Sequence, residues 1–160
     1  MTCRERLEKL LKERGIQFKV QSHEPAYTAQ ELAGKLHVPG QRVAKVVIAL
    51  AGPRPVMLVL PAPDQVDLEE VGRMLGLPGA VRLASEDEIR NLFPDCEVGA
   101  EPPFGGFYGL QLLVDRQLIG EPEIVFRIGT HNHVMRLRYD DYARVAKPVT
   151  GQFARRPESA

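Results

Sequence analysis

The sequence has no long apolar run, few cysteines and no excess of either charge, and each absence excludes a class of protein. No window of the 160 residues approaches the roughly 18 to 20 uninterrupted apolar residues of a membrane span. The charged opening Met1–Arg6 is unlike a signal peptide, so we expect a cytoplasmic protein with no membrane partner. Cys3 and Cys96 form neither a Cys-x-x-Cys pair nor a disulfide-dense pattern. We expect both to be reduced, and Cys96 to be a buried structural thiol and not a nucleophile.

The balance of charge also limits the kind of partner. The 21 lysines and arginines equal the 21 aspartates and glutamates in number, which excludes a strongly basic coat for nucleic acid. Positive residues nevertheless gather in the last third, where Arg136 and Arg138 share one face of a predicted strand. Two interpretations of this pair stay open: a patch that binds RNA phosphates, or a solvated strand face with ion pairs.

Helix starts are marked by a side-chain cap followed three residues later by glutamate. The pattern occurs four times, at Thr2-x-x-Glu5, Thr28-x-x-Glu31, Asp67-x-x-Glu70 and Ser85-x-x-Glu88, and each is followed by apolar residues at helical spacing. Asp140 is the expected cap of a fifth, short helix.

Short apolar or alternating runs predict the strands. They cover residues 16–21, 43–50, 56–60, 81–83, 111–114, 123–128 and 134–139. With no repeat or long linker, the chain is expected to form one domain over residues 1–150, followed by a flexible tail at 151–160 with little to bury. The fold class is α/β (mixed α+β), with a mixed, largely antiparallel sheet or a partly closed barrel surrounded by short helices.

Two parts of the sequence are candidates for a functional site. The stretch Gly99–Gly109 holds four glycines and two adjacent prolines, which exclude a helix or a central strand and indicate a shaped loop with bare backbone N–H groups. Lys45 is the lone charge of the apolar run 43–50. A lysine there can face such a loop across a pocket, although a snorkelling surface lysine is the plain alternative.

Three motifs in order carry a resemblance to a known family. They are Ala44-Lys45, the stretch Val98-Gly99-Ala100-Glu101-Pro102-Pro103-Phe104-Gly105, and Gly129-Thr130-His131 followed by Asp141-Tyr142 and Lys147-Pro148. Together they resemble the YbaK-type aminoacyl-tRNA deacylases, the family that also supplies the editing domain of bacterial prolyl-tRNA synthetases. The resemblance implies a free-standing hydrolase that cleaves the ester of a mischarged small amino acid, such as Cys or Ala, on tRNA.

The resemblance also implies roles for individual residues. The family's essential lysine falls on Lys45, and its Gly-x-x-x-Pro loop falls on Gly99 and Pro103. Further substrate-binding residues are then expected on the same loop and near it: Phe104, Gly105, His131, His23 and Thr28. The implied mechanism uses no cofactor, no metal and no protein nucleophile. Its partners are mischarged tRNA and, as a second candidate, an aminoacyl-tRNA synthetase. The charge pattern, and not the resemblance, makes Arg136 and Arg138 the candidate tRNA-binding residues.

Other interpretations of the same residues remain. Thr28 is equally explained as a helix cap. His131 and His133 alternate as a metal pair would on a strand, but no matching Asp, Glu or Cys lies nearby in the sequence, which disfavours a metal site. Two functions of other classes compete with the deacylase: a non-catalytic module that binds aminoacyl-tRNA or a synthetase, and a Schiff-base enzyme that uses Lys45.

Overall fold

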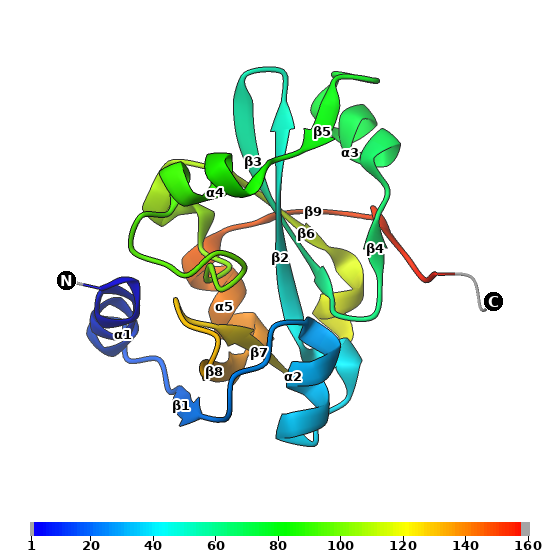
Figure 1. Ribbon diagram of the computed structural model, residues 1–160. Helices are drawn as coiled ribbons and strands as arrows, with labels where there is room; N and C mark the ends of the chain where they lie inside the picture. Colours follow the sequence, from blue (N-terminus) through cyan, green and yellow to red (C-terminus); the bar gives the residue numbers. More distant parts are fainter. Residues whose placement is uncertain (1, 158–160) are drawn as a thin grey trace.

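A long hairpin runs through the middle of the molecule and the other elements are arranged around it (Figure 1). In the computed structural model, which describes residues 2–157, the hairpin consists of β2 (Ala44–Ala51) and β3 (Arg54–Pro61). It belongs to a five-stranded sheet of order β5-β2-β3-β6-β9. The outer strands are β5 (Val81–Leu83), β6 (Gln111–Asp115) and β9 (Val149–Gly151). Strand β5 pairs antiparallel with β2, whereas β6 is parallel to both β3 and β9.

A second, antiparallel sheet lies beside the first. Its order is β1-β8-β7, with β1 at Lys19–Ser22, β8 at His133–Arg138 and β7 at Glu123–Arg127. A single parallel bridge between Val43 and Val125 joins the two sheets. The expected single domain with a mixed, largely antiparallel sheet is confirmed. The barrel alternative is wrong, because β5 and β9 each have a strand partner on one side only within the described residues.

Five α-helices of the described part of the chain surround the sheets. They are α1 (Cys3–Glu13), α2 (Ala29–Leu36), α3 (Leu68–Leu75), α4 (Glu86–Leu92) and α5 (Tyr139–Ala146). The four predicted caps are confirmed, because each cap side chain accepts the N–H of the glutamate three residues on. The cap predicted at Asp140 is wrong: α5 begins two residues earlier than that cap would place it, and its N-cap residue, Arg138, makes no side-chain cap. None of the helices within residues 2–157 is long and apolar enough to cross a membrane.

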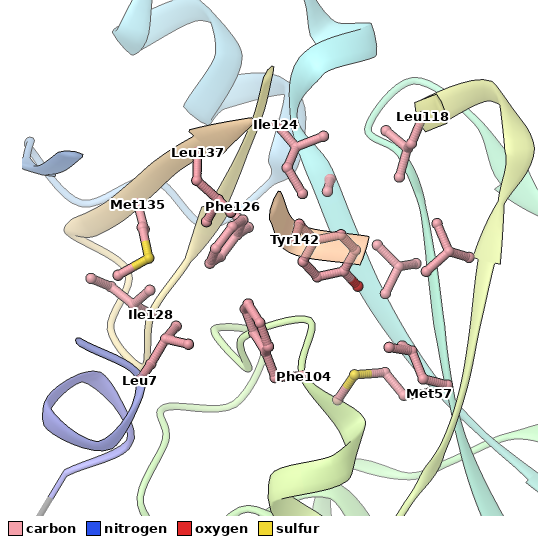
Figure 2. Close-up of a cluster of buried hydrophobic side chains, with 14 of the residues drawn as sticks. Leu7, Met57, Phe104, Leu118, Ile124, Phe126, Ile128, Met135, Leu137 and Tyr142 are labelled. Atoms are coloured by element: carbon pink, nitrogen blue, oxygen red, sulfur yellow. The ribbon is translucent and has the colours of Figure 1, made fainter. Parts of the chain in front are cut away.

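The main core lies where α1, the second sheet and the stretch Gly99–Gly109, which we call the Gly-Pro loop, meet. Figure 2 shows Phe104 of that loop placed between Leu7 of α1 on one side and Met57 of β3 on the other. The rings of Phe126 and Tyr142 pack edge-on against Phe104, with centroids 5.6 and 5.2 Å away. Aromatic burial of this kind fixes the loop from behind.

The end of the described chain is bound to the domain. Phe153 is fully buried, and β10 (Ala154–Arg155) pairs with β4 (Gln65–Val66). The backbone N–H groups of Phe153 and Ala154 donate to the buried carboxylate of Asp115, at 2.9 and 2.8 Å. The prediction that the tail has little to bury is therefore wrong for residues 151–157, and residues 158–160 of that tail lie outside the described residues. A single phenylalanine in a polar stretch shows no periodicity from which its burial could be predicted.

Candidate active site

A small pocket brings the two predicted pieces of the site together. It lies between β2, α2 and the first residues of the Gly-Pro loop, and its volume is about 170 Å³. Its walls are formed by Tyr27, Ala29, Leu32, Val43, Ala44, Lys45, Val46, Gly99, Glu101 and Arg127. Lys45 and Gly99 are far apart in the sequence, so their shared pocket is a product of the fold.

Lys45 is the cation on the β2 wall. Burial lowers the pKa of its ammonium group, and the negative charge of Asp64 opposes this shift. Asp64 is itself buried and accepts a hydrogen bond from Nε of Arg156 at 2.9 Å. A partly desolvated ammonium interacts more strongly with a developing negative charge than a fully hydrated one does.

Glu101 occupies the loop wall. Its side chain is only 3% exposed, and its Oε1 accepts the N–H of Gly99 at 2.9 Å. Burial raises the pKa of the Glu101 carboxyl, while hydrogen bonds from the loop backbone and the charge of Arg127 lower it. The sequence predicts bare N–H groups along the loop, but two of them are paired. Gly99 donates to Glu101, and Ala100 donates to the carbonyl of Glu97 at 3.0 Å.

Arg127 connects three segments around the pocket through hydrogen bonds. Its guanidinium donates to the carbonyl oxygens of Thr28 at 3.0 Å and Gly99 at 3.4 Å, and to Nδ1 of His131 at 2.9 Å. Only 9% of the residue is exposed. Burial lowers the pKa of Arg127, and the charges of Glu101 and Glu31 oppose that shift.

His131 and Thr28 support the pocket from behind it. Nδ1 of His131 accepts from Arg127, which requires the hydrogen to sit on Nε2, and Nε2 donates to the carbonyl of Val98 at 2.8 Å. Gly99 has φ +87°, and a Cβ there would lie 3.3 Å from Cε1 of His131. The Thr28 side chain caps α2, as its alternative interpretation states. Neither His131 nor Thr28 is among the residues that line the pocket.

The other histidines lie elsewhere. His23 does not line the pocket; its Nδ1 contacts the carbonyl of Glu24, and its buried Nε2 has no hydrogen-bond partner within the described residues. His133 contacts the hydroxyl of Thr130 at 2.7 Å, so it does not face the partners of His131. Across residues 2–157 no three His, Cys, Asp or Glu side chains are grouped to hold a metal ion.

The second half of the predicted loop faces the core and not the pocket. Pro103 accepts a hydrogen bond from the Tyr142 hydroxyl at 2.7 Å, and Phe104 is 3% exposed. A Cβ on Gly105 would lie 2.9 Å from the carbonyl oxygen of Leu110, so only glycine fits there. These three residues hold the loop in place.

Arg136 and Arg138 line a different hollow. It is an open groove of about 830 Å³ beside the end of β8, where Lys12 and Lys19 contribute further positive charge. Arg136 pairs with Glu123 at 3.5 Å, and Arg138, whose side chain is 74% exposed, pairs with Asp140 at 4.0 Å. The basic groove supports the interpretation of the pair as an RNA-binding patch, and the ion pairs support the interpretation as a solvated strand face.

Besides the apolar wall, the sequence reasoning missed the three other pocket residues with polar side chains: Tyr27, Glu101 and Arg127. Arg127 follows the apolar run Ile124–Phe126, the same pattern of one charge in an apolar strand that singled out Lys45. Glu101 lies within the second motif, between Gly99 and Pro103, but only the backbone of this loop was considered as part of the site. Tyr27 precedes a helix cap and has no distinguishing pattern.

Comparison with known proteins identifies the family. A family model described as "Aminoacyl-tRNA editing domain" matches residues 23–145. The multifunctional Ser/Thr-tRNA deacylase ProXp-y of Escherichia coli K12 is 32% identical over 158 residues, which cover 94% of this chain and 92% of that protein.

Solved structures share the fold. A hypothetical protein designated APE2540 superposes with a TM-score of 0.82 at 24% identity, covering 93% of this chain and 99% of its own. A protein described as a proposed trans-editing enzyme for prolyl tRNA synthetase gives 0.79 at 22% identity, covering 96% and 97%. Together with the family match, these findings agree with the three motifs found in the sequence: the chain belongs to the aminoacyl-tRNA editing domain family.

Proposed function

We propose that this chain is a trans-editing aminoacyl-tRNA deacylase that hydrolyses the ester of a mischarged small amino acid in the pocket around Lys45. Family membership supports the reaction class. The observation that carries the assignment of the site is the convergence of Lys45, Gly99, Glu101 and Arg127 on one small pocket. Serine and threonine are the first substrates to test, because the E. coli relative is named for them.

The size of the pocket favours a small acyl group. Its volume of about 170 Å³ is close to that of an engineered cavity of about 150 Å³ that holds one benzene molecule. Benzene and a seryl group have the same number of heavy atoms. The pocket therefore suits seryl, threonyl, alanyl or cysteinyl groups, with the terminal ribose of the tRNA outside it.

The charges of the pocket match an aminoacyl ester. The free α-ammonium group of the substrate is positive, and Glu101 is the one acid among the residues that line the pocket. We assign the Glu101 carboxylate to hold that ammonium group. The negative charge that develops on the ester carbonyl oxygen during attack is then stabilised by Lys45, and a well-placed donor of this kind is worth about 3 to 4 kcal/mol.

Water is the nucleophile in this scheme. Among the described residues that line the pocket, none is serine, threonine, cysteine or histidine. The proton of the attacking water passes to a substrate group such as a ribose hydroxyl, as in the mechanism that the family resemblance implies. The tRNA acceptor end leaves with its hydroxyl restored, and the amino acid leaves as the free acid.

The test is release of labelled amino acid from tRNA charged with Ser, Thr, Ala, Cys or Pro. We expect at least one ester to be cleaved by the wild type, and cleavage to fall at least about 100-fold in Lys45→Ala, since a loss of 3 to 4 kcal/mol is a factor of 10² to 10³. Lys35→Ala is the matched control, because Lys35 lies exposed on α2 and pairs only with Glu24. Equal rates in the two variants would remove Lys45 from the site.

The non-catalytic alternative has its own outcome in the same assay. If no ester is cleaved while charged tRNA still binds, the chain is a binding module. Repeating the assay with and without a prolyl-tRNA synthetase tests whether a synthetase is a partner, which stays a prediction.

We assign the groove at Arg136 and Arg138 to the tRNA backbone. The register pairs Val125 with Arg136 and Arg127 with Val134, so Arg127 of the pocket and Arg136 lie on the same face of the second sheet. Arg136→Gln with Arg138→Gln should raise KM, leave kcat unchanged and flatten the salt dependence of KM. Arg90→Gln on α4, whose arginine pairs with Asp87, is the control.

A further inference from the structure

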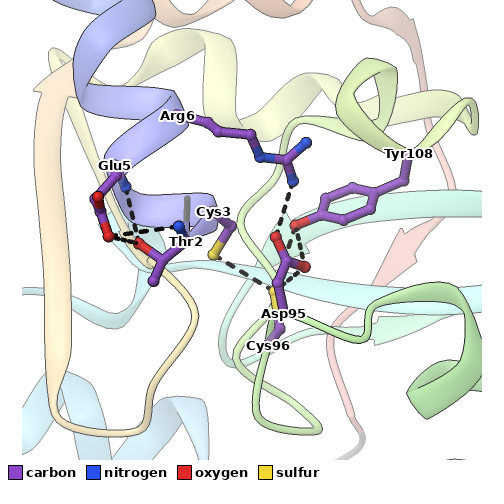
Figure 3. A network of polar contacts seen from close by, with 7 residues as sticks. All are labelled: Thr2, Cys3, Glu5, Arg6, Asp95, Cys96 and Tyr108. Carbon is purple, nitrogen blue, oxygen red and sulfur yellow. Dashed lines mark hydrogen bonds and ion pairs between the residues drawn. The ribbon is translucent and has the colours of Figure 1, made fainter.

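The two cysteines, far apart in sequence, are neighbours in space. Cys3 is the first residue of α1 and Cys96 lies in the segment between α4 and Gly99. Their Sγ atoms are 3.5 Å apart, and the Cys96 thiol donates to Cys3 (Figure 3). Both are free thiols. The deacylase chemistry proposed above uses neither of them.

We propose that Cys3 and Cys96 are a peroxide-sensitive dithiol whose oxidation to a disulfide displaces the pocket loop and slows deacylation. In the first step the Cys3 thiolate attacks one oxygen of hydrogen peroxide, the O–O bond breaks, and hydroxide leaves and is protonated to water. In the second step Cys96 loses its proton and attacks the sulfur of the Cys3 sulfenic acid, which releases a second water. Two thiols are oxidised and one peroxide is reduced.

Polar groups around the pair favour a thiolate on Cys3. The hydrogen bond from Cys96 lowers the pKa of the Cys3 thiol, against the opposing effects of burial and of Asp95, while Cys96 retains its proton. Arg6 binds Asp95 at 2.8 Å and offsets its negative charge. Cys3 also lies at the positive end of the α1 dipole, a position at which reactive cysteines are found.

Peroxide has a path to the pair. Cys3 is almost fully buried, but it borders an open hollow of about 460 Å³ between the first turn of α1 and the segment from Ile128 to His133. Cys96 is partly exposed. We expect a molecule as small as hydrogen peroxide to approach the pair through this hollow.

The pair is connected to the pocket by a short path. Cys96 is three residues before Gly99, and the intervening Glu97 donates its N–H to the carbonyl of Gly129 at 2.8 Å. Gly129 lies against Cys3, since a Cβ there would be 2.6 Å from its Sγ. An S–S bond is about 2.05 Å long, so the sulfurs must approach by about 1.5 Å. A displacement of about 1 Å near reacting groups can cost about 100-fold in rate.

The first part of the test does not depend on the proposed function. Reduced protein is treated with a small excess of hydrogen peroxide, and we expect the intact mass to fall by about 2 Da with no covalent dimer. A non-reducing digest should yield the Cys3 peptide joined to the Cys96 peptide. The cross-link closes a long loop, so the melting temperature should rise by about 5 to 10 °C. Cys3→Ser and Cys96→Ser proteins, each compared with its own untreated sample, should show no such shift.

The second part, which rests on the proposed function, measures deacylation by the same samples. Oxidised wild type should be at least about 10-fold slower than reduced wild type, and dithiothreitol should restore the rate. The Cys96→Ser protein should keep its rate after the same treatment. Oxygen addition at the cysteines without a cross-link would overturn the proposal, and so would an unchanged rate in fully cross-linked protein. Absence of turnover in reduced wild type would instead overturn the proposed function, and the mass and melting data would still decide whether the dithiol forms.

Discussion

The two halves of the Gly-Pro loop are adjacent in sequence and lie in opposite environments. Gly99 and Glu101 line the pocket, where they meet Arg127 and Lys45. Pro103 and Phe104 turn the other way, into the aromatic core around Tyr142. One short segment thus supplies both a wall of the site and the anchor that holds that wall.

This difference separates the expected effects of substitution along the loop. Changes in the first half should act on catalysis or on the pocket's charges. Changes in the second half should act on the free energy of unfolding and leave the rate per folded molecule close to that of the wild type. Substitutions in and around the loop test that division.

Phe104→Ala should give the largest loss of stability. The ring is 3% exposed and packs against Phe126 and Tyr142, and truncation of such a buried phenylalanine costs about 3 to 5 kcal/mol. Urea unfolding monitored by circular dichroism measures the change. Deacylation by the folded fraction should stay within a few-fold of the wild type. A stable variant that has lost all activity would place Phe104 in the site and contradict the division.

Arg127→Met should lower both stability and activity. The change removes hydrogen bonds to the carbonyls of Thr28 and Gly99 and to His131, and leaves Glu101 without its nearby positive charge. Loss of one partner from a buried polar network costs about 2 to 4 kcal/mol. Arg138→Met, at an exposed arginine, is the control for stability and should change the free energy of unfolding by less than about 0.5 kcal/mol.

Local sequence patterns predicted most of the secondary structure. The four caps that the structure confirms are local hydrogen bonds between residues three apart, so the sequence contains all that is needed to place them. Asp140 is a suitable residue type for a cap, but α5 follows β8 directly and begins two residues earlier than a cap at Asp140 would place it. Phe153 is buried by contacts with distant strands, which no local pattern records.

The residues of the pocket were only partly predictable from the sequence. Lys45 and Gly99 were found because the motif and the lone charge pointed to them. Arg127 was not, although its pattern is the same, because only the fold brings it beside Gly99. The direction in which Phe104 points depends on the core behind it, so a motif alone could not divide the loop into its two halves.

Tyr142→Phe tests the anchor half of the loop because it removes one hydrogen bond and little else. The hydroxyl is fully buried and donates to Pro103 at 2.7 Å, so its loss should cost about 1 to 2 kcal/mol. Tyr139→Phe is the matched control, because the structure records no hydrogen bond from the Tyr139 hydroxyl within the described residues. Deacylation should be unchanged in both variants. A large fall in kcat for Tyr142→Phe would show that the anchor half of the loop also controls the chemistry.

Glu101→Gln should have the smallest effect on stability and a characteristic dependence on pH. Burial raises the pKa of this carboxyl above its ordinary value of 4.5. The folded protein therefore holds the proton to higher pH than the unfolded chain does. The stabilisation that comes from binding this proton is fully present below the pKa of Glu101 in the unfolded chain. It is lost as pH rises through the pKa of Glu101 in the folded protein. Glutamine keeps an oxygen that accepts the Gly99 N–H but does not titrate.

Urea unfolding of Glu101→Gln and wild type from pH 4 to pH 8 measures this linkage. The stability of the variant relative to wild type should increase as pH rises from 4.5. Glu86→Gln, at an exposed residue of α4, provides the comparison for loss of a surface carboxyl. A difference that stays flat over this range would mean that the Glu101 carboxyl titrates alike in the folded and unfolded chains. In that case the rise that burial causes in the pKa of Glu101 would be fully offset by the backbone donors and by Arg127. The evidence for a role of Glu101 in the pocket would then come from the KM of the variant alone.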